Sequence, residues 1–148
     1  MSKLLSMLIL MLTFSSKSYS QSPKKDETLA YINRMLGTSC QVDLKGGTMM
    51  VSFRDPEGKL LREDKAQIMD LEFDVNYDQE YHLLCMPCLK DVAGCVTRTL
   101  MVQKSKRETD RISIAVEDES KYKNLQKAFE HLIRLEAEHG YKDEVTLE

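Results

Sequence analysis

The sequence predicts a single α+β domain, mostly β, in which short strands form a barrel or sandwich and a C-terminal helix caps it. Three observations support this prediction: short segments of alternating apolar and polar residues, tight turns between them, and one long apolar stripe at helical spacing near the C-terminus. An uncharged apolar run near the N-terminus bears on the destination of the chain and not on its fold.

Residues 1–20 have the pattern of a secretory signal peptide. Lys3 gives a short basic start, residues 4–14 are apolar and uncharged, and residues 18–20 match the small-x-small pattern that precedes a cleavage site. The apolar run is too short to span a bilayer. We therefore expect export to the periplasm or the exterior, with a mature chain that begins at Gln21.

Composition limits the partners of the mature chain. Removal of the signal peptide takes away two of the 21 basic residues and none of the 24 acidic ones, which leaves 128 residues with a net charge of −5. This size is enough for one domain with its own apolar core. The acidic balance argues against nucleic acid, and no later segment is apolar enough to cross a membrane. We expect a flexible lead-in over 21–25, the domain over 26–140 and an acidic, frayed tail over 141–148.

The predicted elements begin with a short amphipathic helix over 26–36, which Asp26 caps and Gly37 ends. A hairpin follows, with a tight turn at Gly46-Gly47. Further turns are expected at residues 55–58, 76–79 and 90–94, and a charged loop over 104–110. The seven expected strands cover residues 40–45, 49–54, 59–64, 66–72, 81–86, 95–102 and 112–116.

The C-terminal segment has the strongest helical pattern in the chain. Asp118 or Ser120 can cap this helix, and Gly140 is expected to end it. A helix with so apolar a face must bury it, most simply on the open end of the barrel. The stripe consists of Tyr122, Leu125, Phe129, Leu132 and Leu135, with Ala128 and Ile133 beside it.

Seven short strands followed by one long helix resemble the pleckstrin-homology-like (PH-like) superfold. Residues 127–135 resemble the closing helix, and residues 27–33 the opening helix, of small exported proteins of unknown function with that architecture. The resemblance covers residues 26–140 and implies a barrel closed by the helix. The closing helix lacks the tryptophan common in this superfold, and Phe129 is expected to fill its place. The first hairpin loop carries only one charge, so the resemblance does not imply phosphoinositide binding.

Four cysteines in an exported chain predict two structural disulfides. Cys88 and Cys95 flank the expected turn at 90–94, so a bridge between them is geometrically reasonable. Cys85 would then pair with Cys40 if the first strand lies near the fifth. Because four cysteines allow three pairings, the sequence leaves the connectivity open.

Two alternatives use the same cysteines for chemistry. Cys85 and Cys88 have the spacing of a thioredoxin-like redox pair, but they follow a strand and do not open a helix. His82 with Cys85, Cys88 and Cys95 would form a zinc site. That set leaves Cys40 over, and an oxidising compartment favours disulfides over thiolates.

The remaining candidate site is basic. Lys104, Lys106, Arg107 and Arg111 gather around the charged loop and could bind an anion, although acidic residues are interleaved with them. Nucleophile-elbow, phosphate-loop and zinc-protease motifs are absent from the sequence, and we expect no cofactor.

The sequence therefore favours an exported, non-catalytic domain that binds a protein partner or belongs to an envelope assembly. One alternative is a periplasmic thiol–disulfide protein that uses Cys85 and Cys88. The other is a domain that binds a small ligand or lipid between barrel and helix.

Overall fold

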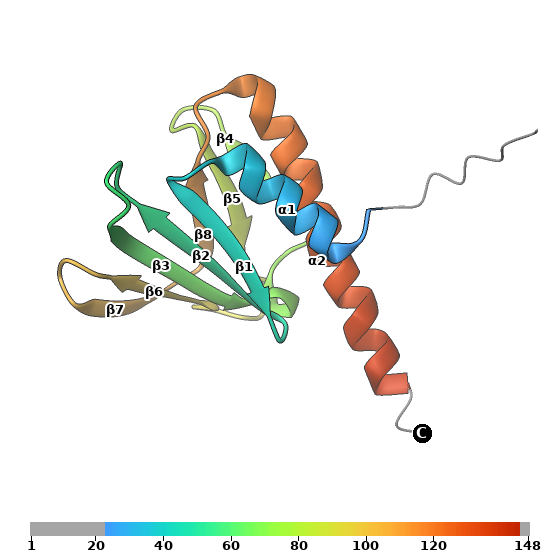
Figure 1. The fold of residues 1–148 in the computed structure, drawn as a ribbon. Coiled ribbons are helices and arrows are strands. Elements are labelled where there is room, and N and C mark those ends of the chain that lie inside the picture. Colours follow the sequence, from blue (N-terminus) through green and yellow to red (C-terminus); the bar gives the residue numbers. More distant parts are fainter. Residues whose placement is uncertain (1–22, 146–148) are drawn as a thin grey trace, which may run out of the picture.

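The structure, a computed structural model, describes residues 23–145, so the predicted signal peptide lies outside the described residues. Two antiparallel sheets pack with one short and one long helix (Figure 1). In chain order the elements are α1 (Lys25–Leu36), β1 (Cys40–Lys45), β2 (Thr48–Arg54), β3 (Leu60–Gln67), a 3-10 turn (Ile68–Asp70), β4 (Asn76–Asp78), β5 (Leu83–Pro87), β6 (Val96–Leu100), β7 (Ser105–Thr109), β8 (Arg111–Ala115) and α2 (Glu119–Val145).

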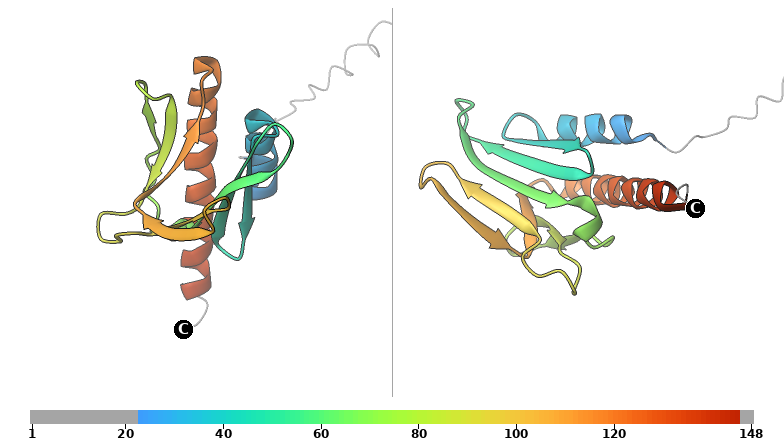
Figure 2. Two further views of the ribbon diagram at one scale, coloured as in Figure 1. Left: turned by 90° about the vertical axis from the view of Figure 1, so that its left-hand side faces the viewer. Right: turned by 90° about the horizontal axis from the view of Figure 1, so that it is seen from below.

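The described residues form an α+β fold, mostly β, without a closed barrel. A five-stranded sheet has the order β1-β2-β3-β6-β7, and a three-stranded sheet has the order β4-β5-β8. Asp110 alone separates β7 from β8, so the chain passes directly from the larger sheet to the smaller one. Figure 2 shows α2 between the three-stranded sheet and α1. The predicted closure into a barrel is wrong because each sheet keeps two edges.

The first hairpin confirms the sequence prediction. Val42 lies opposite Val51, and both side chains are buried. Gly46 and Gly47 connect the strands with φ angles of 57° and 78°, a left-handed conformation that glycine adopts without steric cost. The turn at 55–58 is also present, since the amide of Gly58 donates a hydrogen bond to the carbonyl of Asp55 at 3.0 Å.

The first helix covers the free edge of β1. The Asn33 amide donates to the carbonyl of Val42 at 2.8 Å and accepts from the Val42 N–H at 2.7 Å. The side chain thus replaces the missing neighbouring strand at that residue. The helix begins at Lys25, one residue before the prediction. Its N-terminal bond runs from the Lys24 N–H to Glu27, so the predicted Asp26 cap is wrong.

Two expectations about the middle of the chain are wrong. The expected strands at 59–64 and 66–72 are one strand, β3, because its pairing with β2 continues in one register from Arg62 to Gln67. A buried 3-10 turn then follows. The expected turn at 76–79 is the strand β4, in which Tyr77 pairs with Leu84 and stacks on Tyr122 with ring centroids 3.9 Å apart. The polar composition of β4 does not indicate a strand, and the stacked tyrosine rings hold it in place.

The strands expected at 81–86 and 95–102 do not pair with each other across the turn expected at 90–94. The first of them, β5, pairs with β4 and β8, whereas the second, β6, pairs with β3 and β7. The segment between them is therefore a crossing from one sheet to the other. The Cys88–Cys95 disulfide closes this crossing, with the two Cα atoms 5.8 Å apart.

The expected charged loop at 104–110 contains the strand β7. With β4 added and two expected strands merged into β3, the described residues hold eight strands where seven were expected. β7 is the outer strand of its sheet and is exposed along most of its length. Charged side chains are common on such edges because they discourage pairing with another chain. The composition that indicated a loop is equally typical of an edge strand.

The core lies between the inner faces of the two sheets and the apolar stripe of α2. Leu125, Phe129 and Leu132 are buried as the stripe predicted. The expected stop at Gly140 is wrong, because the helical backbone continues to Val145. One glycine in a helix interior costs only about 1 kcal/mol, which is too little to end a helix by itself.

Candidate functional site

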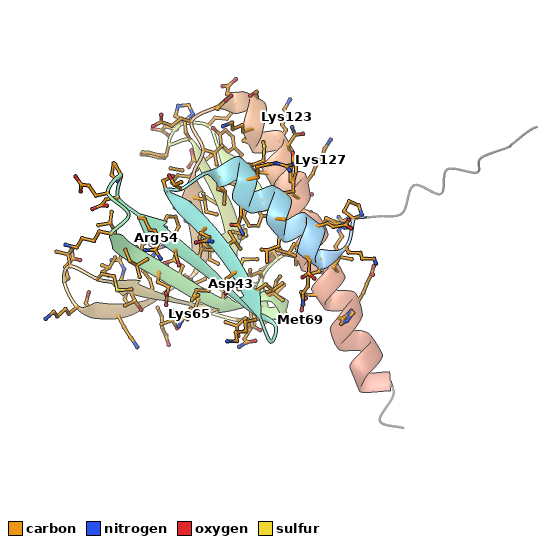
Figure 3. All side chains as sticks on the ribbon, viewed as in Figure 1. Asp43, Arg54, Lys65, Met69, Lys123 and Lys127 are labelled. Carbon is orange, nitrogen blue, oxygen red and sulfur yellow. A yellow bond between two sulfur atoms is a disulfide. The ribbon has the colours of Figure 1, made fainter. Side chains whose placement is uncertain are left out.

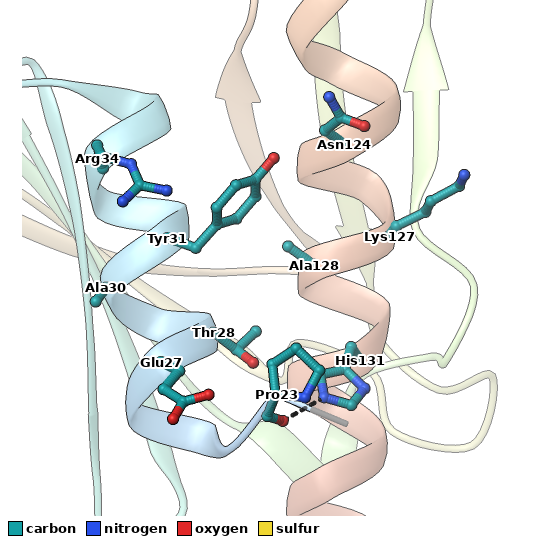
Figure 4. A pocket seen from close by; sticks show the side chains of 10 residues that line it. All are labelled: Pro23, Glu27, Thr28, Ala30, Tyr31, Arg34, Asn124, Lys127, Ala128 and His131. Atoms are coloured by element: carbon teal, nitrogen blue, oxygen red, sulfur yellow. Dashed lines mark hydrogen bonds between the residues drawn. The ribbon is translucent and has the colours of Figure 1, made fainter. Parts of the chain in front are cut away.

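A groove of about 650 Å³ lies between α1 and α2 (Figure 4). Its surface is mainly apolar. Pockets of this size bind small organic molecules in many proteins. The residues that line it are Pro23, Glu27, Thr28, Ala30, Tyr31 and Arg34 on one side, and Asn124, Lys127, Ala128 and His131 on the other.

Helical spacing places these residues on one side of each helix. On α1 Glu27, Ala30, Tyr31 and Arg34 recur every three or four residues, beside the face that carries buried Thr28 and Ile32. On α2 the same spacing separates the lining residues from buried Leu125 and Phe129. Ala128 points toward α1 and is too small to fill the space between the helices, whereas Ala30 lies on the side of α1 away from α2 (Figure 4).

The lower end of the groove is closed by hydrogen bonds. His131 Nε2 donates to the carbonyl of Pro23 at 2.8 Å. The Thr28 hydroxyl donates to the carbonyl of Lys24 at 2.9 Å. His131 and Thr28 are thus hydrogen-bonded to backbone oxygens.

The upper end of the groove is cationic. The Arg34 guanidinium carbon lies 5.4 Å from the centroid of the Tyr31 ring. Lys127 belongs to the lining, but its ammonium group points away from α1 (Figure 4). Glu27 is the one acid among the lining residues. Arg34 therefore places a positive charge at this end, although the whole chain has a net charge of −3.

The structure contains one of the two favoured disulfides. Cys88 is bonded to Cys95, as predicted, whereas Cys40 and Cys85 are free buried thiols. The favoured Cys40–Cys85 pair required the first strand to lie near the fifth. Instead β1 is an edge strand of the larger sheet, paired with β2, and β5 is the central strand of the smaller sheet.

Cys85 and Cys88, the two cysteines of the redox alternative, have different partners. Cys88 is engaged with Cys95, and the sulfur of Cys85 lies 3.8 Å from the carbonyl of Leu83 and from the Ser113 hydroxyl. The two residues of the predicted redox pair are therefore not bonded to each other.

The zinc set is not assembled either. His82 lies in a turn, with its Nδ1 3.2 Å from the Tyr77 hydroxyl. Cys88 and Cys95 are joined in the disulfide, so two of the four proposed ligands are not thiolates. Over residues 23–145 no group of three or more metal-ligating side chains comes together.

The structure does not bring the basic residues of the predicted anion site together. Lys106 and Arg107 are neighbours on β7, so their side chains point to opposite faces of the sheet. Arg107 lies opposite Arg98, and Lys106 lies opposite Thr99. Lys104 precedes β7, and Arg111 begins β8.

A second hollow, of about 210 Å³, lies on the outer face of β1, β2 and β3. Asp43, Met50 and Lys65 line it from adjacent strands, with Lys45 and Thr48 at its end (Figure 3). It is smaller than the groove between the helices, and its charges are of both signs.

The sequence did not reveal the groove. Ala30 and Tyr31 lie beside the apolar stripe of the first predicted helix, and Ala128 beside that of the second. A small side chain such as Ala128 could have indicated a gap, but only if the helices were known to be neighbours. Their contact is tertiary, and no local pattern encodes it.

The family models, the curated proteins and the solved structures with which we compared the chain contain no significant match. None of the helices over residues 23–145 is long and apolar enough to span a bilayer.

Proposed function

We propose that the protein is an exported, non-catalytic binding domain whose ligand occupies the groove between α1 and α2. The ligand is an anionic amphiphile: an apolar chain or ring that ends in a carboxylate. The observation that carries this proposal is the combination of an apolar groove of about 650 Å³ with a cationic upper end.

The lining supports one orientation of such a ligand. The apolar part lies along Tyr31 and Ala128, where the surface is uncharged. The carboxylate lies at the upper end, within reach of Arg34, whose planar guanidinium pairs with carboxylates through two hydrogen bonds. The closed lower end, where His131 bonds to Pro23, sets the limit of the apolar part.

Calorimetric titration with decanoate tests this proposal. We expect binding to the mature protein with a Kd on the order of 0.1 mM, since a ligand of this size gains only a few tenths of a kcal/mol per atom. Decyltrimethylammonium, with the same chain and the opposite charge, is expected to bind more weakly because Arg34 would repel its head group.

Two variants separate the apolar and the charged contacts. Ala128→Phe fills the groove from the position that points toward α1, and Arg34→Gln removes the carboxylate partner. Each is expected to weaken decanoate binding by about tenfold or more. Lys59→Gln, which removes an exposed charge outside the groove, is the matched control. Equal affinities for all four proteins would contradict the proposal.

The PH-like resemblance and export remain part of the proposal. Short antiparallel strands that end in one long helix support an open variant of the PH-like superfold. The signal-peptide pattern over residues 1–20 and the Cys88–Cys95 bridge support export. Mass spectrometry of the protein from the producing cells is expected to give a mature N-terminus at Gln21. An uncleaved chain in the cytoplasmic fraction would contradict export.

A further inference from the structure

Three arginines and one aspartate gather on the inner face of the five-stranded sheet, far from the helical groove in sequence. We call Arg62, Asp64, Arg98 and Arg107 the arginine cluster. Asp64 on β3 lies opposite Arg98 on β6, which in turn lies opposite Arg107 on β7. Residues directly opposite each other in a sheet share a face. The cluster therefore spans three adjacent strands.

The carboxylate of this cluster is already saturated. Asp64 is completely buried, and Arg98 donates to both of its oxygens, from Nε and Nη2, at 2.9 Å each. Arg62 adds a third cationic contact, with Nη2 3.4 Å from Oδ2. Asp64 thus neutralises one positive charge in a cluster that contains three.

The excess charge is not neutralised elsewhere in the described chain. Within residues 23–145 Arg107 makes no salt bridge, yet it faces Arg98 directly. Like charges opposite each other on neighbouring strands destabilise a sheet. Burial lowers the pKa of Arg62, an effect that Asp64 opposes and that repulsion from Arg98 and Arg107 reinforces. Two of the three positive charges in the arginine cluster are therefore not balanced by a carboxylate within it.

One donor of the cluster also lacks an acceptor. Arg62 stacks over the Phe53 ring at 3.7 Å and donates from Nη2 to the carbonyl of Ser113 at 2.8 Å. Its Nε is buried and has no hydrogen-bond partner. A buried charged donor without an acceptor is costly.

We propose that the arginine cluster binds a phosphate-type dianion, either free or as the head group of a larger molecule. Two uncompensated positive charges match the charge of a phosphate monoester near neutral pH. Guanidinium groups match its oxygens through paired hydrogen bonds. Arg107 is exposed and Arg98 is 12% exposed, so the anion approaches from the β7 side. This site is independent of the helical groove and its proposed carboxylate ligand.

Titration with inorganic phosphate at constant ionic strength, with sodium chloride as the compensating salt, tests the proposal. In an NMR spectrum of the arginine side chains, we expect the Nε–Hε signals of Arg98 and Arg107 to shift. The signal of Arg34, in the helical groove, is expected to stay unchanged. Titration with glycerol phosphate distinguishes the two sources, since only a site that recognises a head group binds the ester as well as free phosphate.

Variants on β7 supply a matched control. Arg107→Gln is expected to weaken phosphate binding by about tenfold or more, and Arg107→Lys by less, because it keeps the charge and loses the planar donors. Lys106→Gln removes a charge from the same strand on the opposite face and is expected to bind phosphate like the unchanged protein. Equal weakening by Lys106→Gln and Arg107→Gln would overturn the proposal. The absence of any shift at about 10 mM phosphate would also overturn it.

Discussion

The buried negative charge of Asp64 is stabilised by two arginine partners. Its carboxylate is fully buried, and Arg98 and Arg62 provide its neutralising charge. Asp64→Ala removes the carboxylate acceptor of Arg98, whose side chain is only 12% exposed. We expect this variant to lose about 3–5 kcal/mol of unfolding free energy, measured by urea denaturation, because an uncompensated buried charge remains.

A double variant tests whether the cost of Asp64→Ala comes from the charge that is left unpaired. Asp64→Leu with Arg98→Met removes both members of the bidentate pair and is expected to recover part of that loss, because apolar side chains of similar size replace a buried pair at little cost, while Arg62 still loses its carboxylate partner. If the double variant is as unstable as Asp64→Ala, the pairing is not what makes the single variant costly.

Cys40 gives the protein a pH dependence above neutrality. Burial, with a further contribution from Asp64 and an opposing one from Arg62, raises the pKa of its thiol from 9.0 to about 12. Above pH 9 the unfolded chain loses this proton while the folded chain keeps it, so stability falls as the pH rises toward the folded value. Between pH 9 and 11 the stability difference from Cys40→Ala is expected to shrink by about 1 kcal/mol per pH unit. Urea denaturation of both proteins across this range measures it, and a constant difference would contradict the burial of the thiol.

At the scale of elements, one side chain of α1 completes the hydrogen bonding of the edge of β1. Asn33 satisfies both backbone groups of Val42 on the otherwise free edge of β1. Asn33→Ala is expected to cost about 1–3 kcal/mol, because two partly buried backbone groups lose their partners. Urea denaturation measures this loss, and light scattering detects any new pairing through the uncovered edge. Asn124→Ala, at an exposed helical asparagine, is the control and is expected to change little.

The crossing between the two sheets depends on the disulfide. Cys88 and Cys95 close a short loop that connects β5 in one sheet to β6 in the other. Reduction is expected to lower the unfolding free energy by about 2–3 kcal/mol, from the loop-closure entropy of the unfolded chain. Thermal or urea unfolding with and without a phosphine reductant measures the change. The Cys88→Ala, Cys95→Ala double variant should not respond to the reductant, and a response there would assign the effect to another bond.

For the whole molecule, the sequence predicted what depends on local pattern. The first hairpin has a clear alternation and a glycine pair, and it lies where expected. The long helix has a stripe centred on Phe129, and that stripe is buried. The Cys88–Cys95 bridge was predicted from its short spacing and is present, although the strands beside it belong to different sheets.

Features that depend on distant pairing were not predictable in this way. The arginine cluster requires the register of β3, β6 and β7, which brings Asp64 beside Arg98 from a segment 34 residues away. β4 and β7 have the composition of loops and form strands only because neighbouring strands bind them. The groove requires α1 to lie beside α2, where Ala128 leaves space between them. Each of these depends on tertiary contacts that local propensity does not contain.

The central claim is that the groove between α1 and α2 binds an anionic amphiphile. The most direct test is an amide NMR titration of the mature protein, residues 21–148, with decanoate below its micelle concentration. The account predicts saturable shifts at the amides of Thr28, Ala30, Tyr31, Arg34 and Ala128, with those of β6 and β7 unchanged. Shifts spread over the whole surface, or none at saturating decanoate, would contradict it.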